Sequence, residues 1–205
     1  MTTTDFPNKA TSPTSILGID PGVSRTGWAV LTSTEHLQAH GTFIPQPWLR
    51  GIDRQLWVLS KLQDLIAEWQ PDVLAYEEFS WCSSDDAAER YVRGRPDIER
   101  LIGGIQGLAL QPPYPVLVGL LPQRWGYQLV GQRSYTKADI ALAVNARLGT
   151  TFNGDFFSNH ASDAAGIALV ALDMLKAQQY QLHYGIDRNT LASHAKAAES
   201  SERVF

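Results

Sequence analysis

The chain has 205 residues, 44% of them apolar, with one cysteine, Cys82, and a formal net charge of −4. This length suits one domain with one hydrophobic core, and the single cysteine excludes internal disulfides and cysteine-based zinc sites and is typical of the reducing cytoplasm, where we expect the protein. No run of about 18 apolar residues occurs, so we expect no membrane span. The acidic balance is evidence against nucleic-acid binding, because domains that bind nucleic acids are usually basic.

The first predicted strand ends in a carboxylate. Residues 16–19 are an apolar run, Asp20 follows, and Pro21-Gly22 forms a turn signal. A charge at the end of a buried strand needs a cation or hydrogen-bond donors, because an isolated carboxylate is costly to bury. Asp20 is therefore either a functional carboxylate or a cap of the Pro-Gly turn, and this stretch alone does not separate the two.

The next elements predict a sheet followed by alternating helices and strands. Residues 28–31 and 36–44 favour two more strands of an antiparallel meander, and leucines at helical spacing indicate an amphipathic helix over 52–69. The short apolar run 73–76 ends in Glu77-Glu78, which repeats the pattern of strand and carboxylate. We expect Glu78 to be a solvated neighbour on the opposite face from Glu77.

The second half is predicted to be mainly helical. Residues 79–96 are expected to form a loop with Gly94 and Pro96 as breakers, followed by a helix over 97–110, a strand over 116–118, a short helix over 122–130, a loop over 131–135, and helices over 136–148 and 160–179. Thr136 and Asp139 are spaced as a capping box. The order predicts one α/β domain, 16–179, with a mixed five-stranded sheet and helices on both faces, between flexible tails at 1–15 and 180–205.

Carboxylates from distant parts of the chain are expected to converge. If the strands before Asp20 and Glu77 are parallel neighbours, both side chains lie at the same end of the sheet. His160 and Asp163 are three residues apart and share one face at the start of a helix. Carboxylate oxygens suit Mg²⁺ or Mn²⁺, and two such ions can assist displacement at a phosphodiester. In that interpretation Asp20 bridges the ions, while Glu77 and Asp163 each hold one.

Simpler roles exist for each residue taken singly. Asp163 at a helix N-terminus is stabilised by the helix dipole, and His160 fits a capping or surface role. Three separate coincidences would be needed to explain the joint pattern in this way.

The ordered motifs resemble those of the RuvC-type Holliday junction resolvases, in a divergent or phage-like branch. The resemblance rests on residues 16–22, on 75–77 and on 160–165 followed by an apolar helix, with further similarity around 103–109 and 130–139. It implies a ribonuclease H-like fold and a homodimer that cuts two opposed strands of a four-way DNA junction with two divalent ions. It also implies a catalytic and metal-binding set of Asp20, Glu77, His160 and Asp163.

The DNA-binding surface is the part in which this chain departs from the family. The family's surfaces are often strongly basic, whereas this chain carries only local charge. The candidate DNA-binding residues are Arg90, Arg93, Arg95, Arg124, Arg133 and Lys137, with Phe79 and Trp81 as aromatics that could stack on an opened base pair. The alternatives are a solvated loop in which the arginines pair with nearby acids, and core packing for Phe79.

Two other functions remain open at this stage. One is a ribonuclease H-like nuclease that acts on other branched DNA or on RNA, and the other is a non-catalytic nucleic-acid-binding module of a larger complex. The complete carboxylate set favours an enzyme, whereas the acidic balance favours the binding module.

Overall fold

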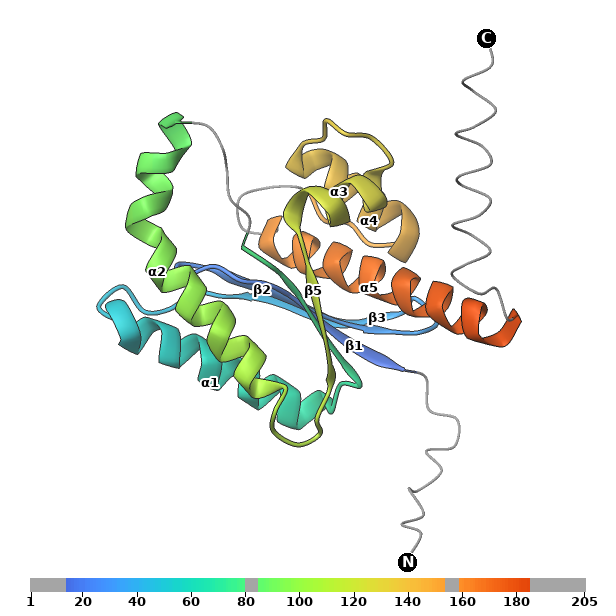
Figure 1. Cartoon of the computed structure of the whole chain (residues 1–205), viewed down its shortest axis with the longest axis horizontal. Helices are drawn as coiled ribbons and strands as arrows, with labels where there is room; N and C mark the ends of the chain where they lie inside the picture. The colour runs from blue at the N-terminus through green and yellow to red at the C-terminus, as the bar shows by residue number, and fades with distance from the viewer. Residues whose placement is uncertain (1–13, 80–84, 154–158, 185–205) are drawn as a thin grey trace, which may run out of the picture. The chain divides into compact units, whose positions relative to one another are not determined.

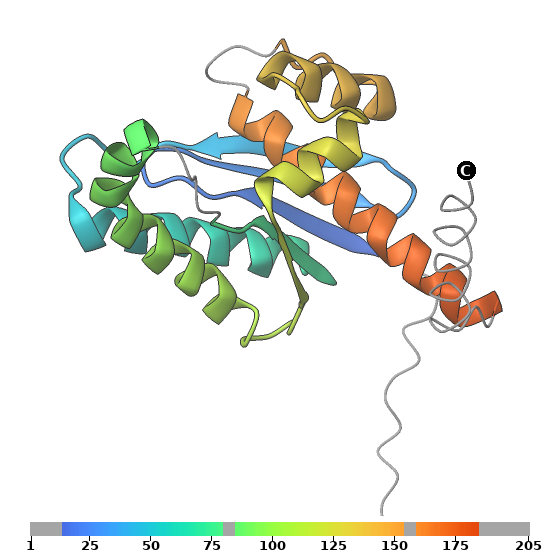
Figure 2. The ribbon, with the colours of Figure 1, turned by 45° about the horizontal axis from the view of Figure 1, so that its top comes forward.

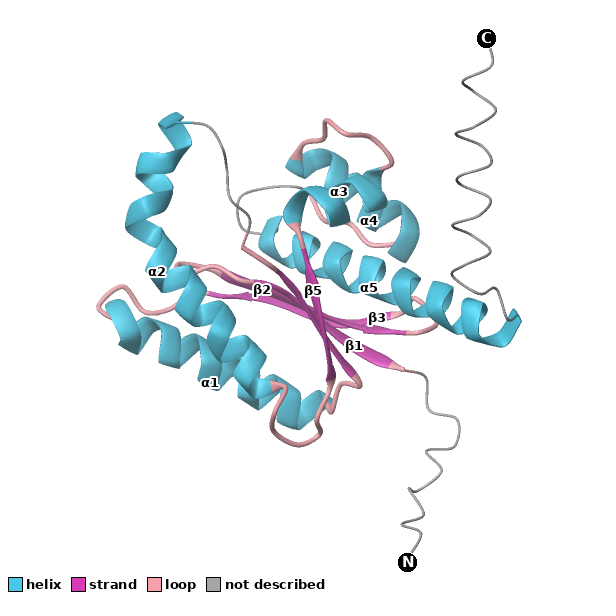
Figure 3. Cartoon of the chain, viewed as in Figure 1, coloured by secondary structure: helices cyan, strands magenta, loops and turns pink. Residues whose placement is uncertain are grey.

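A five-stranded mixed sheet carries the rest of the fold (Figures 1 and 3). The computed structural model describes residues 14–79, 85–153 and 159–184. The strands are β1 (Ser15–Asp20), β2 (Thr26–Thr32), β3 (Leu37–Phe43), β4 (Val73–Glu77) and β5 (Val116–Leu120), in the spatial order β3-β2-β1-β4-β5. The first three form the predicted antiparallel meander, while β4 pairs with β1 and β5 in parallel.

Helices lie on both faces of this sheet. They are α1 (Gly51–Trp69), α2 (Asp85–Leu108), α3 (Pro122–Val130), α4 (Lys137–Leu148) and α5 (Asn159–Tyr184). Helices α1 and α2 cover one face, and α5 with α3 and α4 lies on the other (Figure 2). Among the described residues, no helix is both long and apolar enough to cross a membrane.

The alternation of side chains along β1 and β4 places the core residues on one face of the sheet and the carboxylates on the other. Leu17 and Ile19 of β1, with Leu74 and Tyr76 of β4, are at most 2% exposed and pack against α1 and α2 in the main core. Because successive side chains of a strand point to opposite faces, the carboxylates that end both strands point to the face on which α5 lies. The register sets Ile19 beside Tyr76, so Asp20 and Glu77 end their strands at the same level.

Two glycines allow the first turns of α5 to lie directly on the sheet. A Cβ added at Gly18 of β1 would stand 2.2 Å from the carbonyl oxygen of Ala164, and one at Gly27 of β2 would stand 1.9 Å from that of His160. Such distances are impossible for a real side chain, so the helix backbone occupies the space that any other residue would need. This close approach holds the N-terminal end of α5 beside the ends of β1 and β4.

The chain forms two compact units, residues 1–171 and 172–205, so the boundary lies within α5. The sheet and all four predicted catalytic residues belong to the first unit. Helix α5 continues to Tyr184, whereas the sequence suggested an end at Gln179. The remainder of the predicted C-terminal tail and residues 1–13 of the N-terminal one lie outside the described residues.

The predicted loop over 79–96 is wrong for most of its length. Helix α2 begins at Asp85 and contains Pro96 in its interior. Proline normally breaks a helix because it lacks an amide donor and clashes with the preceding turn. Here the strong helix formers in residues 87–90 outweigh that signal, so Arg90, Arg93 and Arg95 belong to a helix.

Replacement of Gly18 by alanine is expected to destabilise the fold by about 1–3 kcal/mol, because the added methyl group overlaps the α5 backbone. The control is Ser60→Ala at an exposed position of α1, where alanine is the better helix former and no loss of stability is expected. Urea unfolding of both variants measures the difference. Equal stability of the Gly18→Ala variant and the wild-type protein would contradict this packing.

Candidate active site at the ends of strands β1 and β4

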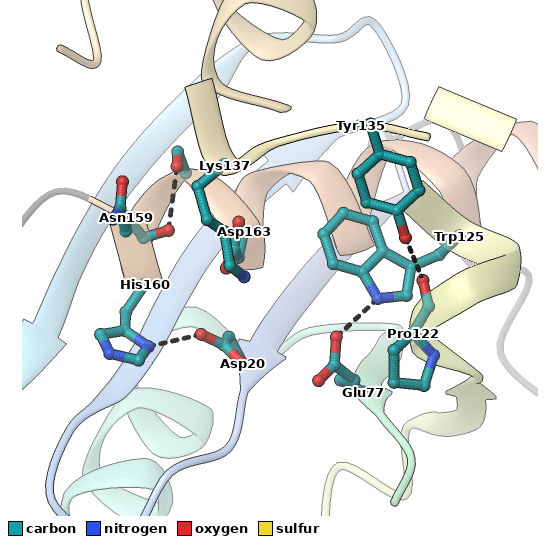
Figure 4. A network of polar contacts seen from close by, with 10 residues as sticks. Asp20, Glu77, Pro122, Trp125, Tyr135, Lys137, Asn159, His160 and Asp163 are labelled. Atoms are coloured by element: carbon teal, nitrogen blue, oxygen red, sulfur yellow. Dashed lines mark hydrogen bonds and ion pairs between the residues drawn. The ribbon is translucent and has the colours of Figure 1, made fainter. Parts of the chain in front are cut away.

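Asp20 and Glu77 stand side by side where two parallel strands end (Figure 4). Asp20 is only 7% exposed although it carries a charge. Glu78, the next residue of the chain, is turned to the other side and lies against Gly119 of β5. The prediction that the two strand ends meet at one edge of the sheet is therefore confirmed, and Glu77 is the carboxylate that faces the site.

The first turns of α5 supply the next two side chains. The Nδ1 atom of His160 is 2.6 Å from Oδ2 of Asp20, so the imidazole and this carboxylate form a direct hydrogen bond (Figure 4). Asp163 lies one turn further along the helix and is 1% exposed. The predicted proximity of the strand ends to this helix start is thus present in the structure.

Lys137 brings a cation to these carboxylates. It is the first residue of α4, which begins with a complete capping box between Thr136 and Asp139. Its ammonium group forms an ion pair with Oδ2 of Asp163. The capping box fixes where α4 starts, and in this way it fixes where Lys137 enters the site.

Burial and the neighbouring charge raise the pKa values of Glu77 and Asp163. Burial, followed by the charge of Asp20, raises the pKa of Glu77 from 4.5 to about 7. Burial and the charge of Asp20 also raise the pKa of Asp163, although Lys137 acts in the opposite direction. The hydrogen bond to Asp20 raises the pKa of His160. Burial alone would lower the pKa of Lys137, but the charges of Asp163, Asp20 and Glu77 raise it above its usual value.

The donor set suits a hard divalent cation in its chemistry. The side chains offer carboxylate oxygens, which Mg²⁺ and Mn²⁺ prefer. Oδ1 of Asp163 is buried and has no hydrogen-bond partner, which is costly for a carboxylate unless a cation binds to this oxygen.

Within the described ranges, no group of three or more histidine, cysteine, aspartate or glutamate side chains is arranged to hold one ion together. Mg²⁺ does not require such a cage, because it usually keeps several waters and takes one or two carboxylates together with substrate phosphates.

Trp125 is a site residue that the sequence reasoning did not identify. Its indole Nε1–H donates to Oε2 of Glu77 at 2.7 Å, and the side chain is 2% exposed. Beside it, the hydroxyl of Tyr135 donates to the carbonyl of Pro122 at 3.0 Å. The available signal was weak, since a tryptophan in an amphipathic helix usually reads as a core residue.

A cavity of about 190 Å³ adjoins these aromatic residues. Its lining includes Glu77, Trp125, Tyr135 and Lys137, together with Pro122, Thr136 and Ile140. The site therefore extends from the strand ends towards the space between α3 and α4, rather than ending at the carboxylates.

Two of the predicted DNA-binding arginines share a cleft. Arg124 and Arg133 line a depression of about 800 Å³ with Gln123, Tyr127, Ser134 and Tyr135. Phe79 is partly buried and packs against the main core, which favours its packing alternative. Trp81 lies outside the described residues. Of Arg90, Arg93 and Arg95 only the backbone is described, within α2.

The chain is similar in sequence to proteins named as crossover junction endodeoxyribonucleases. The RuvC crossover junction endodeoxyribonuclease of Parvibaculum lavamentivorans is 29% identical over 157 residues, which cover 75% of this chain and 83% of that protein. The enzyme of the same name from Caulobacter vibrioides is 40% identical over 70 residues, which cover 32% of this chain and only 41% of that protein. No family model matches the chain.

The solved structures agree in fold. The structure of Thermus thermophilus RuvC superimposes with a TM-score of 0.63 at 20% identity, covering 80% of this chain and 96% of that one. The complex of T. thermophilus RuvC with a Holliday junction substrate gives 0.62 at 21% identity, covering 77% and 92%. The ribonuclease H-like fold expected from the sequence is thereby confirmed. Together with this fold, the relatives named above support a RuvC-type family of Holliday junction resolvases for this chain.

Proposed function

We propose that this protein is a metal-dependent, structure-selective DNA endonuclease that resolves four-way junctions by paired nicks. The observation that carries the proposal is the convergence of Asp20, Glu77 and Asp163 at one edge of the sheet, from β1, β4 and α5. Its relatives are named crossover junction endodeoxyribonucleases. A cytoplasmic location is part of this proposal.

Asp20, Glu77 and Asp163 would hold two divalent ions, Mg²⁺ or Mn²⁺. The charge of Asp20 raises the pKa of both Glu77 and Asp163, so Asp20 is close enough to both to interact with them. It is therefore our candidate for the ligand that the two ions share. When bound, the ions would stabilise the charge that develops on the attacking and leaving oxygens of the phosphodiester.

The side chains around the carboxylates have separate tasks. His160 is bonded to Asp20 and is 31% exposed at its side chain, so it can orient the carboxylate or a water molecule at the mouth of the site. Lys137 is 58% exposed at its side chain while its ammonium contacts Asp163. It can therefore also reach a DNA phosphate beside the scissile bond, where a cation favours the negative charge.

The DNA would lie across the face that bears α3 and α4. The cleft with Arg124 and Arg133 begins beside the cavity next to Glu77, because Tyr135 lines both. Local arginine charge is sufficient for phosphate contacts and makes affinity depend steeply on salt. Arg90, Arg93 and Arg95 stay candidates for a second contact from α2.

A homodimer would provide the two active sites that paired nicks require. Helix α2 has an open surface at Gly103 and Gly107, where an added Cβ meets nothing within 4 Å. Such a surface allows close approach of a second helix, and we propose it as the place where two copies meet.

Product mapping tests the substrate. Labelled four-way junction, flap, duplex and RNA–DNA hybrid substrates are incubated with the protein and Mg²⁺. Symmetric nicks in two opposed strands of the junction alone support the proposal. Equal cutting of flap or hybrid substrates would point to a nuclease of broader specificity, and junction binding without cutting in any divalent metal would point to a binding module.

The Asp20→Asn variant is expected to lose at least about 100-fold in the rate of junction cleavage, or roughly 2.7 kcal/mol of transition-state stabilisation. The amide preserves size but removes the charge that would be shared by the cations. Junction affinity should stay close to that of the wild-type protein in a gel-shift assay. The control is Asp53→Asn, the same change at an exposed position of α1, which should cut normally.

The stability of the metal-free protein should fall as the pH rises, because of Glu77. Its pKa is about 7 in the folded protein against 4.5 in the reference state. Glu77 is largely neutral in both states below pH 4.5, whereas between pH 4.5 and 7 the unfolded chain ionises and the folded protein keeps the proton, so stability is lost over this range and the loss is complete above pH 7. The Glu77→Gln variant escapes this cost, so it should gain roughly 2–3 kcal/mol relative to wild type between pH 4.5 and pH 8.

Urea unfolding at both pH values in EDTA measures that gain. Adding Mg²⁺ at pH 8 should stabilise the wild-type protein more than the variant, which keeps only Asp20 and Asp163 as charged ligands. A difference between the two proteins that is the same at both pH values contradicts the assigned pKa.

A further inference from the structure

Trp125 joins three elements of the site. It belongs to α3, its indole N–H donates to Glu77 at the end of β4, and its ring lies against α5. A Cβ added at Gly166 of α5 would stand 3.1 Å from Cζ3 of this ring, and Gly166 is three residues beyond Asp163. The absence of a side chain at Gly166 thus makes room for the indole. Through Trp125, helix α3 therefore contacts Glu77, the carboxylate that ends β4 (Figure 4).

The ring is closely packed in this position. It is 2% exposed and enclosed by the helices, with Leu129 and Val144 also approaching Gly166. A buried indole N–H requires an acceptor, and here Oε2 of Glu77 is that acceptor at 2.7 Å. Because the ring is closely packed, its N–H stays directed at this oxygen and restricts the rotation of the carboxylate.

The chemistry of the donor matters as much as its position. An indole N–H donates one hydrogen bond, carries no charge and has no lone pair for a cation. It therefore engages one oxygen of Glu77 without neutralising the carboxylate or competing for a metal, and Oε1 is left to face a ligand. A lysine or arginine in the same place would reduce the negative charge that attracts a divalent ion.

We propose that Trp125 is a positioning residue that orients Glu77 for divalent-cation binding. This inference rests on the proposed function, since it assumes that Glu77 holds an ion. Partners that orient metal ligands typically contribute 10- to 100-fold to metal affinity or activity. Trp125 touches neither the proposed ions nor DNA in this role, and it acts only through Glu77.

The Trp125→Phe variant tests this role because phenylalanine keeps most of the buried ring and removes the donor. We expect the affinity for Mn²⁺, measured by calorimetry on the full chain without DNA, to fall by about 10-fold or more. Junction cleavage should fall similarly at low Mg²⁺ and recover in part at high Mg²⁺, because the lesion is in cation binding. The control is Trp69→Phe at the end of α1, a tryptophan packed against the core on the opposite face of the sheet.

A measurement on the wild-type chain removes the dependence on how well the variant folds. The indole N–H resonance of Trp125 is assigned in a ¹H–¹⁵N spectrum, and MgCl₂ is then added without DNA. We expect this resonance to shift with the same dissociation constant that calorimetry gives, and MnCl₂ to broaden it before the indole signals of Trp57 and Trp69. The broadening locates manganese beside Trp125, and the loss of Mn²⁺ affinity in Trp125→Phe separates a positioning role from a merely structural one.

The outcomes separate the two proposals. If the wild-type protein cleaves junctions and binds Mn²⁺, but Trp125→Phe does both equally well, then the role of Trp125 is overturned and the proposed function stands. An indole resonance that ignores saturating Mg²⁺ overturns the role in the same way. If the wild-type protein neither binds Mn²⁺ nor cuts, both proposals fail.

Discussion

The contact between β1 and the first turns of α5 is the constraint on which the site depends. Gly18 and Gly27 let the helix backbone rest on the sheet at a distance that no side chain would permit. Because the register of β1 and β4 is parallel, their terminal carboxylates already lie side by side. The helix then adds its own acid, Asp163, from the same face. Fold and site are thus linked through two positions that carry no side chain at all.

The resulting concentration of negative charge is unfavourable for the protein without metal. Two contacts partly offset it: the ammonium of Lys137 pairs with Asp163, and the imidazole of His160 forms a hydrogen bond with Asp20. Glu77 accepts a hydrogen bond from the neutral donor of Trp125, and burial together with the charge of Asp20 raises its pKa to about 7, although Lys137 acts in the opposite direction. The chain therefore keeps a group of acids whose burial lowers its own stability, which is typical of a site selected for binding cations rather than for folding. The overall charge of −4 says little about such a local arrangement.

Much of this could be predicted from the sequence because the signals are local and repeated. An apolar run ending in a carboxylate occurs at both Asp20 and Glu77, and the spacing of His160 and Asp163 places them at a helix start. The segment before Pro96 was misjudged because breaker residues were given more weight than the helix formers that precede them. Trp125 escaped notice for a different reason: its hydrogen bond joins residues 48 positions apart, and no pattern along the chain reveals where a buried indole N–H points.

The central claim is that Asp20, Glu77 and Asp163 bind divalent cations in order to cut DNA. Anomalous scattering from crystals grown with MnCl₂ tests it most directly, since it locates manganese without assuming its ligands. We expect density bonded to a carboxylate oxygen of Asp20 and to one of Glu77 or Asp163, with the ammonium of Lys137 moved away from Asp163. Crystals of protein that cleaves junctions with Mn²⁺, but in which saturating manganese binds elsewhere or leaves these carboxylates free, would contradict the claim.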